Sequence, residues 1–225
     1  MRKYITLIAV TVLIVGWHTM APSSLKTYRK RRGLTKAKKL PEPYGSIKKK
    51  KTKLPLFVIQ MHDASHLHYD FRLEIDGVLK SWAVPKGVPT QLGIRRLAMP
   101  TDDHPMEYGH FEGIIPEGHY GGGTVMVWDI GTFENIKTHN DKPVSLEESY
   151  KKGTVEIFIY GKKIWGPYAL IKTKGLSNKE SWILLKMNPR KGFGVRKNKA
   201  VKKNISAISG RTLKQIEQDA DAVWE

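Results

Sequence analysis

Cysteine is absent from the 225-residue chain. Its absence excludes disulfides, thiolate zinc sites and a cysteine nucleophile, so any metal must bind through His, Asp or Glu. Acidic side chains are scarce near both ends of the chain. Residues 1–53 carry fifteen Lys or Arg and one acid, Glu42, and residues 186–214 carry ten Lys or Arg and no acid. Residues 54–185, with fourteen basic and sixteen acidic side chains, form a nearly neutral core between two basic arms.

The two basic arms suit a phosphate backbone, because each neutralised phosphate releases condensed counterions without any reading of sequence. The formal net charge of +18 therefore indicates an acidic polymer as partner. Membrane surfaces and acidic proteins attract the same charge, and runs such as KKKKTK (48–53) are also common in disordered solubilising tails. The arms by themselves leave these alternatives open.

A long hydrophobic run is missing as well. The apolar run from Ile5 to Val15 is too short for a membrane span and is closer to the core of a signal peptide. Residues 1–19 are interpreted either as such a segment or as the result of a translation start placed before Met20. We expect a cytoplasmic protein whose core has no membrane partner.

Few segments before residue 206 could form a long helix. Apolar and polar residues instead alternate with a period of two. The segments that alternate predict strands at 56–62, 68–75, 78–84, 95–100, 124–130, 154–160, 167–173 and 181–187. Turn-forming residues such as Asp76-Gly77 separate them. This pattern predicts a mainly β fold, a closed or nearly closed antiparallel barrel with flanking basic arms. After Thr212, apolar residues at helical spacing predict a short C-terminal helix.

The segment HYDFRLEI (68–75) is ionisable on one side only. Strict alternation puts apolar side chains on one face of the strand and four ionisable ones on the other: His68, Asp70, Arg72 and Glu74. A His-x-Asp pair by itself is usually no more than a polar strand face, with Arg72 as a salt-bridge partner.

The preceding strand repeats this arrangement with Gln60 and His62. Residues 63–67 can reverse the chain and bring His62 beside His68 and Asp70. We expect these two imidazoles and one carboxylate on the inner wall of the barrel. Such a set makes a three-ligand site for a divalent first-row metal and leaves positions for water or substrate, which favours a metal site over a plain polar face.

A second cluster of polar residues follows the fourth predicted strand. His104 precedes Pro105, which restricts its backbone toward extended geometry, and Tyr108 lies four residues on. If both side chains reach the same cavity, they supply a proton donor and a phenol for an anionic group; otherwise His104 is structural. The glycines of PEGHYGGG (116–123) could cradle phosphate, but we interpret them as a barrel corner.

Two long stretches, FVIQMHDASHLHYDFRLEIDGVLKSWAVPKG (57–87) and DDHPMEYGHFEGIIPEGHYGGGTVMVWDIGTFE (102–134), resemble the 3′-phosphoesterase domain of bacterial DNA ligase D and its stand-alone bacterial and archaeal relatives. The likeness runs from about Leu56 to Met187, and SGRTLKQI (209–216) resembles the segment that follows this domain in fused ligases. The resemblance implies a manganese-dependent end-healing enzyme on a β-barrel. Such enzymes trim a 3′-terminal ribonucleotide to a 3′-phosphate and then remove the phosphate to leave a 3′-OH.

The resemblance also implies a role for each motif residue. The metal ligands, holding Mn²⁺ or another divalent first-row ion, would be His62, His68 and Asp70. The residues that hold the scissile phosphate would be Arg72 and His104, with Gln60 and Tyr108 in support.

The N-terminal arm departs from the pattern of the family. There, an Arg-Asp pair and a Glu-Pro step assist activity. Glu42-Pro43 matches the second part, but YRKRRGLTKAKKLPEP (28–43) contains no aspartate. This loss bears on removal of the ribonucleotide more than on metal binding.

The implied division of the chain has four parts. They are the signal-like segment or misplaced start at 1–19, the basic N-terminal arm at 20–53, the phosphoesterase β-barrel domain at 54–187, and the basic tail with its short helix at 188–225. Expected partners are DNA or DNA/RNA 3′ ends, together with an ATP-dependent DNA ligase, a repair polymerase and Ku.

Two rival functions fit parts of the sequence. In a non-haem iron oxygenase, two histidines and a carboxylate also bind the metal, but the distal histidine usually comes long after the His-x-Asp pair, whereas His62 precedes it by six residues. A non-catalytic nucleic-acid-binding barrel explains the arms and the fold, but it gives no reason for the ionisable strand face.

Overall fold

The computed structural model describes the chain in five stretches, residues 25–31, 54–174, 180–189, 191–194 and 204–223. Glu42 and the segment 1–19 lie outside the described residues. So do most of the basic arm and part of the basic tail that follows the barrel.

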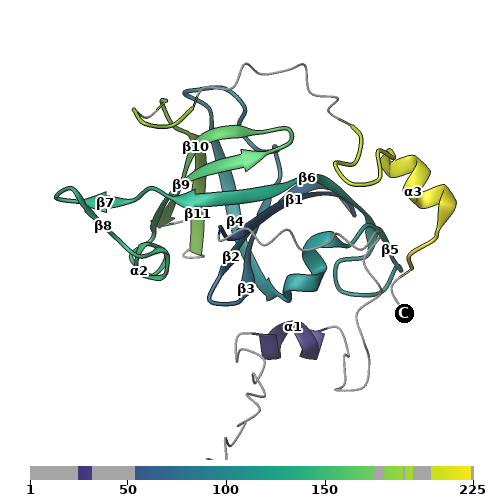
Figure 1. The fold of residues 1–225 in the computed structure, drawn as a ribbon. Coiled ribbons are helices and arrows are strands. Elements are labelled where there is room, and N and C mark those ends of the chain that lie inside the picture. Colours follow the sequence, from purple (N-terminus) through teal and green to yellow (C-terminus); the bar gives the residue numbers. More distant parts are fainter. Residues whose placement is uncertain (1–24, 32–53, 175–179, 190, 195–203, 224–225) are drawn as a thin grey trace, which may run out of the picture.

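Eight antiparallel strands close into a barrel (Figure 1). Their order is β1-β2-β3-β4-β11-β10-β9-β6, and β6 pairs back onto β1. The strands are β1 (Leu56–Asp63), β2 (Leu67–Ile75), β3 (Val78–Val84), β4 (Arg95–His104), β6 (Gly123–Asn135), β9 (Thr154–Gly161), β10 (Trp165–Lys174) and β11 (Glu180–Lys186). The prediction of a closed antiparallel barrel is confirmed.

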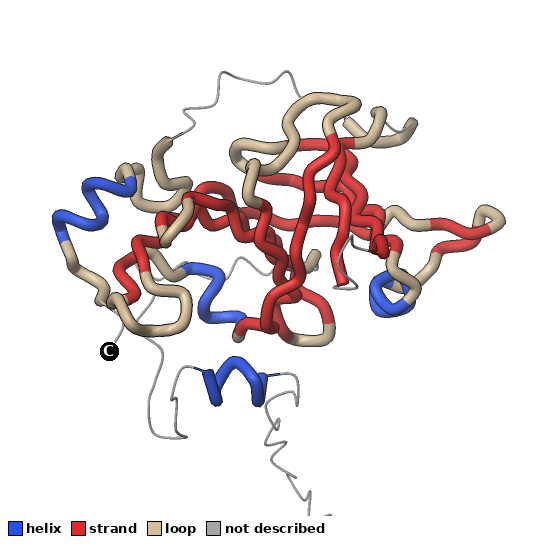
Figure 2. The backbone as a smooth tube through the Cα atoms, turned by 180° about the vertical axis from the view of Figure 1, so that it is seen from behind, coloured by secondary structure: helices blue, strands red, loops and turns tan. Residues whose placement is uncertain are grey.

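Several shorter elements decorate the barrel. The additional strands are β5 (Gly113–Ile115), β7 (Thr138–His139) and β8 (Lys142–Pro143), and the helices are α1 (Leu25–Arg31), the 3₁₀ turn η1 (Met106–His110), α2 (Leu146–Lys151) and α3 (Leu213–Asp219). The predicted C-terminal helix is α3, whose Thr212 forms a capping box with Gln215. Figure 2 shows α1 beneath the barrel. The helix contacts β4, and Arg31 reaches Asp102 near the end of that strand.

The barrel interior is apolar. One cluster of buried side chains, including Phe57, Phe71, Trp82 and Trp182, draws members from all eight barrel strands. Only the inner face of a closed barrel can bring eight strands into one cluster, and the interior of an eight-stranded barrel is filled by such side chains.

The ionisable face therefore lies on the outside of the barrel, and the expectation of an inner wall was wrong. His62 and Asp70 alternate with Met61 and Phe71, which belong to the interior cluster. Alternation then turns the polar side chains outward. Over this outer face lie η1 and α1, with Tyr28, Tyr108 and their neighbours forming a smaller apolar cluster.

The segment after the barrel packs back onto it. Ile216 of α3 is fully buried and joins the interior cluster. The backbone N–H of Ile114 donates to the carbonyl of Ala222 at 2.8 Å, which adds a short pairing to β5. No helix among the described residues has the length and hydropathy needed to span a membrane.

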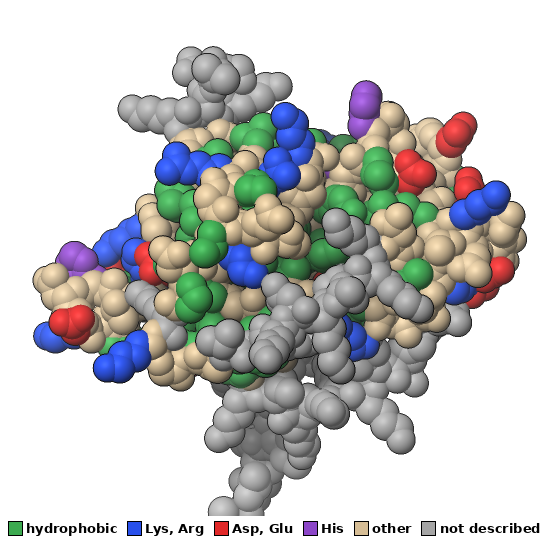
Figure 3. All heavy atoms as spheres, turned by 90° about the horizontal axis from the view of Figure 1, so that it is seen from above, with side chains coloured by type: hydrophobic (Ala, Val, Ile, Leu, Met, Phe, Trp, Pro, Cys, Tyr) green, Lys and Arg blue, Asp and Glu red, His purple; other side chains and the backbone are tan. Residues whose placement is uncertain are grey.

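The exposed surface of the described part carries both signs of charge. Figure 3 shows basic, acidic and apolar side chains interspersed on one face, without a single continuous basic patch. This agrees with the near balance of charge in residues 54–185 and leaves the excess positive charge to the arms.

Candidate active site

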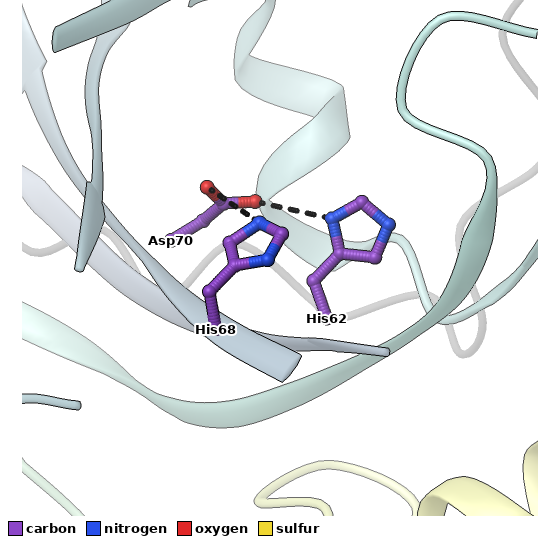
Figure 4. A group of neighbouring side chains, drawn as sticks. All are labelled: His62, His68 and Asp70. Carbon is purple, nitrogen blue, oxygen red and sulfur yellow. Dashed lines mark ion pairs between the residues drawn. The ribbon is translucent and has the colours of Figure 1, made fainter. Parts of the chain in front are cut away.

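Strand register brings the predicted site residues together. On neighbouring antiparallel strands, Gln60 pairs with Asp70, and His62 pairs with His68. Side chains of directly paired residues project from the same face of the sheet, with Cβ atoms about 4.5–5.5 Å apart. Three side chains from β1 and β2 thereby converge, and Figure 4 shows both imidazoles directed toward the carboxylate.

The geometry of this group fits a metal ion. His62 Nδ1 lies 3.7 Å from one carboxylate oxygen of Asp70, and His68 Nε2 lies 3.8 Å from the other. These separations are too long for hydrogen bonds. Ligand atoms at about 2.1 Å from one metal lie roughly 3–4 Å apart, so both separations suit atoms that share an ion. One ligand atom from each residue falls within 4.8 Å of the others.

The histidine tautomers also suit metal binding. The carbonyl of His66 lies 2.8 Å from His68 Nδ1 and accepts its proton, so Nε2 presents a lone pair toward Asp70. An outer hydrogen bond of this kind orients a metal-binding imidazole. The sequence analysis did not assign His66 to the site, and its contribution comes from the backbone. His62 Nε2 is buried and has no hydrogen-bond partner within the described stretches.

Asp70 is held ionised by its surroundings. Burial alone would raise the pKa of this carboxyl, but the positive charge of Arg72 and the neighbouring imidazoles outweigh it and hold the pKa well below the usual range. Arg72 Nη2 donates to Asp70 at 2.9 Å, and the arginine is only 2% exposed. A carboxylate that stays charged is the form that binds a cation.

The guanidinium of Arg72 is fixed on several sides. Its Nε donates to the side-chain oxygen of Gln60 at 2.7 Å, and its carbon lies 5.0 Å from the ring centre of Tyr108. The amide nitrogen of Gln60 in turn donates to the carbonyls of Tyr108 and Phe111. Gln60 and Tyr108 therefore hold Arg72 and tie η1 to the sheet.

His104 completes the group from β4. Its Nδ1 lies 2.7 Å from the carbonyl of Asp102 and 2.9 Å from Arg72 Nη1. One ring nitrogen cannot both donate a proton and accept one. The carbonyl of Asp102 can only accept and the N–H of Arg72 can only donate, so Nδ1 bonds the first when it carries the proton and the second when it does not.

The extension of β4 explains how His104 reaches Arg72. The sequence predicted a strand ending at residue 100, but β4 continues to His104 and pairs it with Leu79 of β3 after a register shift. Because all four residues of the TDDH run (101–104) are polar, they show no alternation of apolar and polar side chains, and the sequence pattern does not predict this pairing.

Two neighbours of His104 were missed by the sequence analysis. Ser81 Oγ lies 3.3 Å from His104 Nδ1, and the ring of Tyr28 lies 4.9 Å from the imidazole, centre to centre. Tyr28 stands in a strongly basic run. The only signal for it is the spacing of Leu25 and Tyr28, which places both on one side of a helix.

Comparison with known proteins decides the family. Residues 60–172 match the DNA ligase D 3′-phosphoesterase domain. The chain belongs to this family. The matched stretch contains every site residue described so far except Tyr28, and the phosphoesterase family identifies the chain as a hydrolase of phosphate esters.

Curated relatives of this phosphoesterase are larger proteins. The chain is 41% identical over 196 residues to the multifunctional non-homologous end joining protein LigD of Pseudomonas aeruginosa, a match covering 85% of this chain and 22% of that protein. It is 43% identical over 167 residues to the multifunctional non-homologous end joining DNA repair protein LigD of Mycobacterium tuberculosis, covering 74% and 20%. The chain therefore spans about a fifth of the length of these relatives.

Proposed function

We propose that this protein is a metal-dependent phosphoesterase that heals DNA 3′ ends. It removes a 3′-terminal ribonucleotide, a 3′-phosphate or both, and leaves a 3′-OH that can be ligated. The observation that carries the proposal is the position of Arg72 and His104 beside the group of His62, His68 and Asp70. A cationic donor and an imidazole next to a cation site suit an anionic phosphoryl group.

The proposed metal ligands are His62, His68 and Asp70, and the proposed ion is Mn²⁺. A divalent ion held there supplies Lewis-acid polarisation of the phosphoryl group and a nucleophile from water at neutral pH. The backbone of His66 and the side chain of Arg72 orient two of these ligands.

Arg72 and His104 are the proposed phosphate-binding residues. Guanidinium N–H groups bind phosphate oxygens through a planar fork, and the fixed position of Arg72 lowers the cost of ordering it. We assign the ring proton to Nδ1, which then donates to the carbonyl of Asp102 and leaves Nε2 as the nitrogen that exchanges a proton with the substrate.

Removal of a 3′-phosphate breaks the bond between phosphorus and the 3′ oxygen, whereas removal of a ribonucleotide breaks the bond between phosphorus and the 5′ oxygen of the departing ribonucleoside and leaves the phosphate on the primer. In both reactions water supplies the new oxygen on phosphorus. His104, in its doubly protonated form, gives its Nε2 proton to the leaving oxygen and recovers a proton from the attacking water.

Glu42 is proposed as an assisting residue on the strength of its Glu-Pro setting alone. The relatives' names refer to non-homologous end joining, and we place this protein in the same kind of repair. Its proposed substrates are primer-templates with DNA or RNA at the 3′ end. An ATP-dependent ligase, a repair polymerase and Ku are the proposed protein partners.

The non-catalytic alternative makes a different prediction about metal. A nucleic-acid-binding barrel would bind DNA equally with and without a divalent ion. It also does not explain why Arg72 is buried and hydrogen-bonded to a carboxylate. The family match argues against a non-haem iron oxygenase, because the matched family acts on phosphate esters.

The test is incubation of labelled primer-templates with and without Mn²⁺. One primer ends in a single ribonucleotide and the other in a 3′-phosphate. We expect shortening of the first, loss of phosphate from the second, and no reaction when the metal is chelated. DNA binding without any metal-dependent change of either primer would favour the non-catalytic barrel.

A further inference from the structure

We infer that helix α1 positions His104 for catalysis through Tyr28 and Arg31, so that part of the basic arm belongs to the active site. The inference rests on the proposed function, because it concerns the imidazole assigned there to the leaving group. It adds two residues of the basic N-terminal arm to Glu42, the residue of this arm already proposed to assist activity. Tyr28 and Arg31 are positioning residues in this account, since they act on His104 and not on the substrate.

Tyr28 closes one side of the His104 ring. The tyrosine is 1% exposed, and its ring meets the imidazole edge-on, with centres 4.9 Å apart and an interplanar angle of 64°. Tyr108 packs on the imidazole as well, at 4.8 Å, and lies 6.3 Å from Tyr28. The contact with Tyr28 is edge-to-face and the contact with Tyr108 is tilted, and such contacts between rings favour one ring orientation over others. The imidazole therefore contacts one aromatic ring from η1 and one from α1, and these two rings also contact each other.

Arg31 fixes the hydrogen-bond acceptor of His104. Its Nη1 lies 3.0 Å from the carboxylate of Asp102, and the carbonyl of the same Asp102 accepts the proton of His104 Nδ1 at 2.7 Å. Arg31 also donates to the hydroxyl of Tyr120 at 3.0 Å. The helix thus holds the residue that selects the tautomer, and it reaches across to the loop between β5 and β6.

The two sides of α1 differ in character. Leu25 and Tyr28 are buried, and Tyr28 packs against the barrel residue His104, whereas Lys26, Arg29 and Lys30 are exposed. A helix of seven residues is too short to be stable by itself in water, so its contact with the barrel is what orders it. Removal of the Tyr28 ring should therefore loosen both the helix and the imidazole beneath it.

The experiment compares Tyr28→Ala, Tyr28→Phe and Arg31→Ala with the full chain. Phosphate release is measured at saturating 3′-phosphate primer and saturating Mn²⁺, so that kcat is separated from DNA affinity. We expect kcat to fall on the order of tenfold or more in Tyr28→Ala and several-fold in Arg31→Ala, because displacement of a catalytic group by a fraction of an ångström is costly. Tyr28→Phe keeps the ring and should restore kcat.

The matched control for the tyrosine is Thr27→Ala, an exposed neighbour on the same helix. The charge control for Arg31 is Lys151→Ala on α2, also exposed. Both should keep the kcat of the unaltered protein. Calorimetry should give the same Mn²⁺ affinity for all five variants, since none removes a proposed ligand.

A second readout follows His104 itself. In protein labelled with ¹⁵N-histidine, the two ring nitrogens report the tautomer, and His104→Asn identifies the signals. We expect one tautomer, protonated at Nδ1, in the unaltered protein and in Tyr28→Phe, and a mixture in Tyr28→Ala and Arg31→Ala. This measurement needs no substrate, so it tests the inference even if the protein releases no phosphate.

Two results would overturn the inference. One is an unchanged kcat in Tyr28→Ala with only a raised KM, which would make α1 a DNA-binding element. The other is an unchanged His104 tautomer in both Tyr28→Ala and Arg31→Ala. An unaltered protein without any metal-dependent phosphate release would instead overturn the proposed function.

Discussion

Asp70 and His68 are both proposed metal ligands, but they differ in burial and in the residues that they contact. Asp70 is the buried counter-ion of Arg72, whereas His68 is partly exposed and hydrogen-bonds to the backbone carbonyl of His66. Loss of one partner of a buried ion pair leaves an uncompensated charge. The two ligands should therefore respond differently to the same truncation.

We predict that His68→Ala abolishes Mn²⁺ binding and phosphate release but leaves the free energy of unfolding nearly unchanged. Asp70→Ala should abolish both as well, and it should also destabilise the protein by about 3–5 kcal/mol, because Arg72 stays buried without its carboxylate. Calorimetry and chemical denaturation measure the two effects. Full manganese-dependent activity in His68→Ala would disprove the ligand assignment.

Arg72→Ala separates phosphate binding from metal binding. We predict a loss of phosphate release on the order of a hundredfold or more, the usual effect of deleting one preorganised donor. Mn²⁺ affinity should persist, since the three proposed ligands remain and removal of a neighbouring positive charge does not weaken attraction for a cation. If calorimetry finds the metal lost, Arg72 acts by holding Asp70 in place.

At the scale of elements, the site depends on a close approach between the β1–β2 turn and the start of β6. Gly123 has φ +137°, and a Cβ atom there would collide with the carbonyl oxygen of Asp63. Gly123 thus brings β6 against the strand that carries His62. The close approach of two backbones is therefore a structural reason for glycine at position 123.

We predict that Gly123→Ala destabilises the protein by about 2–4 kcal/mol, since backbone strain adds to the collision. Gly118→Ala in the same loop is the matched control. It also has a positive φ, +84°, but its Cβ would meet no atom within 4 Å. Its cost should be about 1–2 kcal/mol. Equal unfolding free energies for the two variants would show that the approach to Asp63 relaxes freely.

The exposed side of α1 should contact the DNA backbone. Replacing Lys26, Arg29 and Lys30 together by Ala leaves the buried side of the helix intact. We predict weaker DNA binding and a shallower dependence on log salt, by up to about 0.9 per lost phosphate contact on duplex. Binding titrations over a range of salt concentrations measure this slope.

A charge-matched control replaces three exposed lysines: Lys142 of β8, Lys151 of α2 and Lys152, the C-cap residue of α2. If these side chains do not contact DNA, the slope stays that of the unaltered protein. An equal change of slope in both triple variants would mean that net charge, and not the position of α1, governs binding.

At the scale of the whole molecule, the two proposed activities should proceed at different rates. The arm has Glu42 but no aspartate before Asp63. We predict that hydrolysis of a 3′-phosphate is faster than removal of a ribonucleotide, because the diester also needs its sugar positioned. Time courses on matched primers give both rates. A diesterase rate equal to the monoesterase rate or above it would show that another residue replaces the missing acid or that the acid was never required.

Much of the architecture could be predicted from local patterns in the sequence. Alternation located all eight barrel strands, and Thr212 marked the start of α3. Alternation also grouped His62, His68 and Asp70 on one face, because side-chain parity is a property of the extended backbone and needs no distant partner. The short helices α1 and α2 were missed, since neither is long enough to show a helical period.

Which face became the inside was decided only by closure of the barrel. Pairing of β6 with β1 makes the strands enclose one volume, and the large apolar side chains fill it, so the ionisable face turns outward. The same holds for His104, which meets Arg72 across 32 residues, and for Tyr28, which meets His104 across 76 residues. The sequence by itself determined the strands and the parity of the proposed ligands. Only the tertiary structure decided what surrounds them, because contacts between segments far apart in the chain leave no trace in local periodicity.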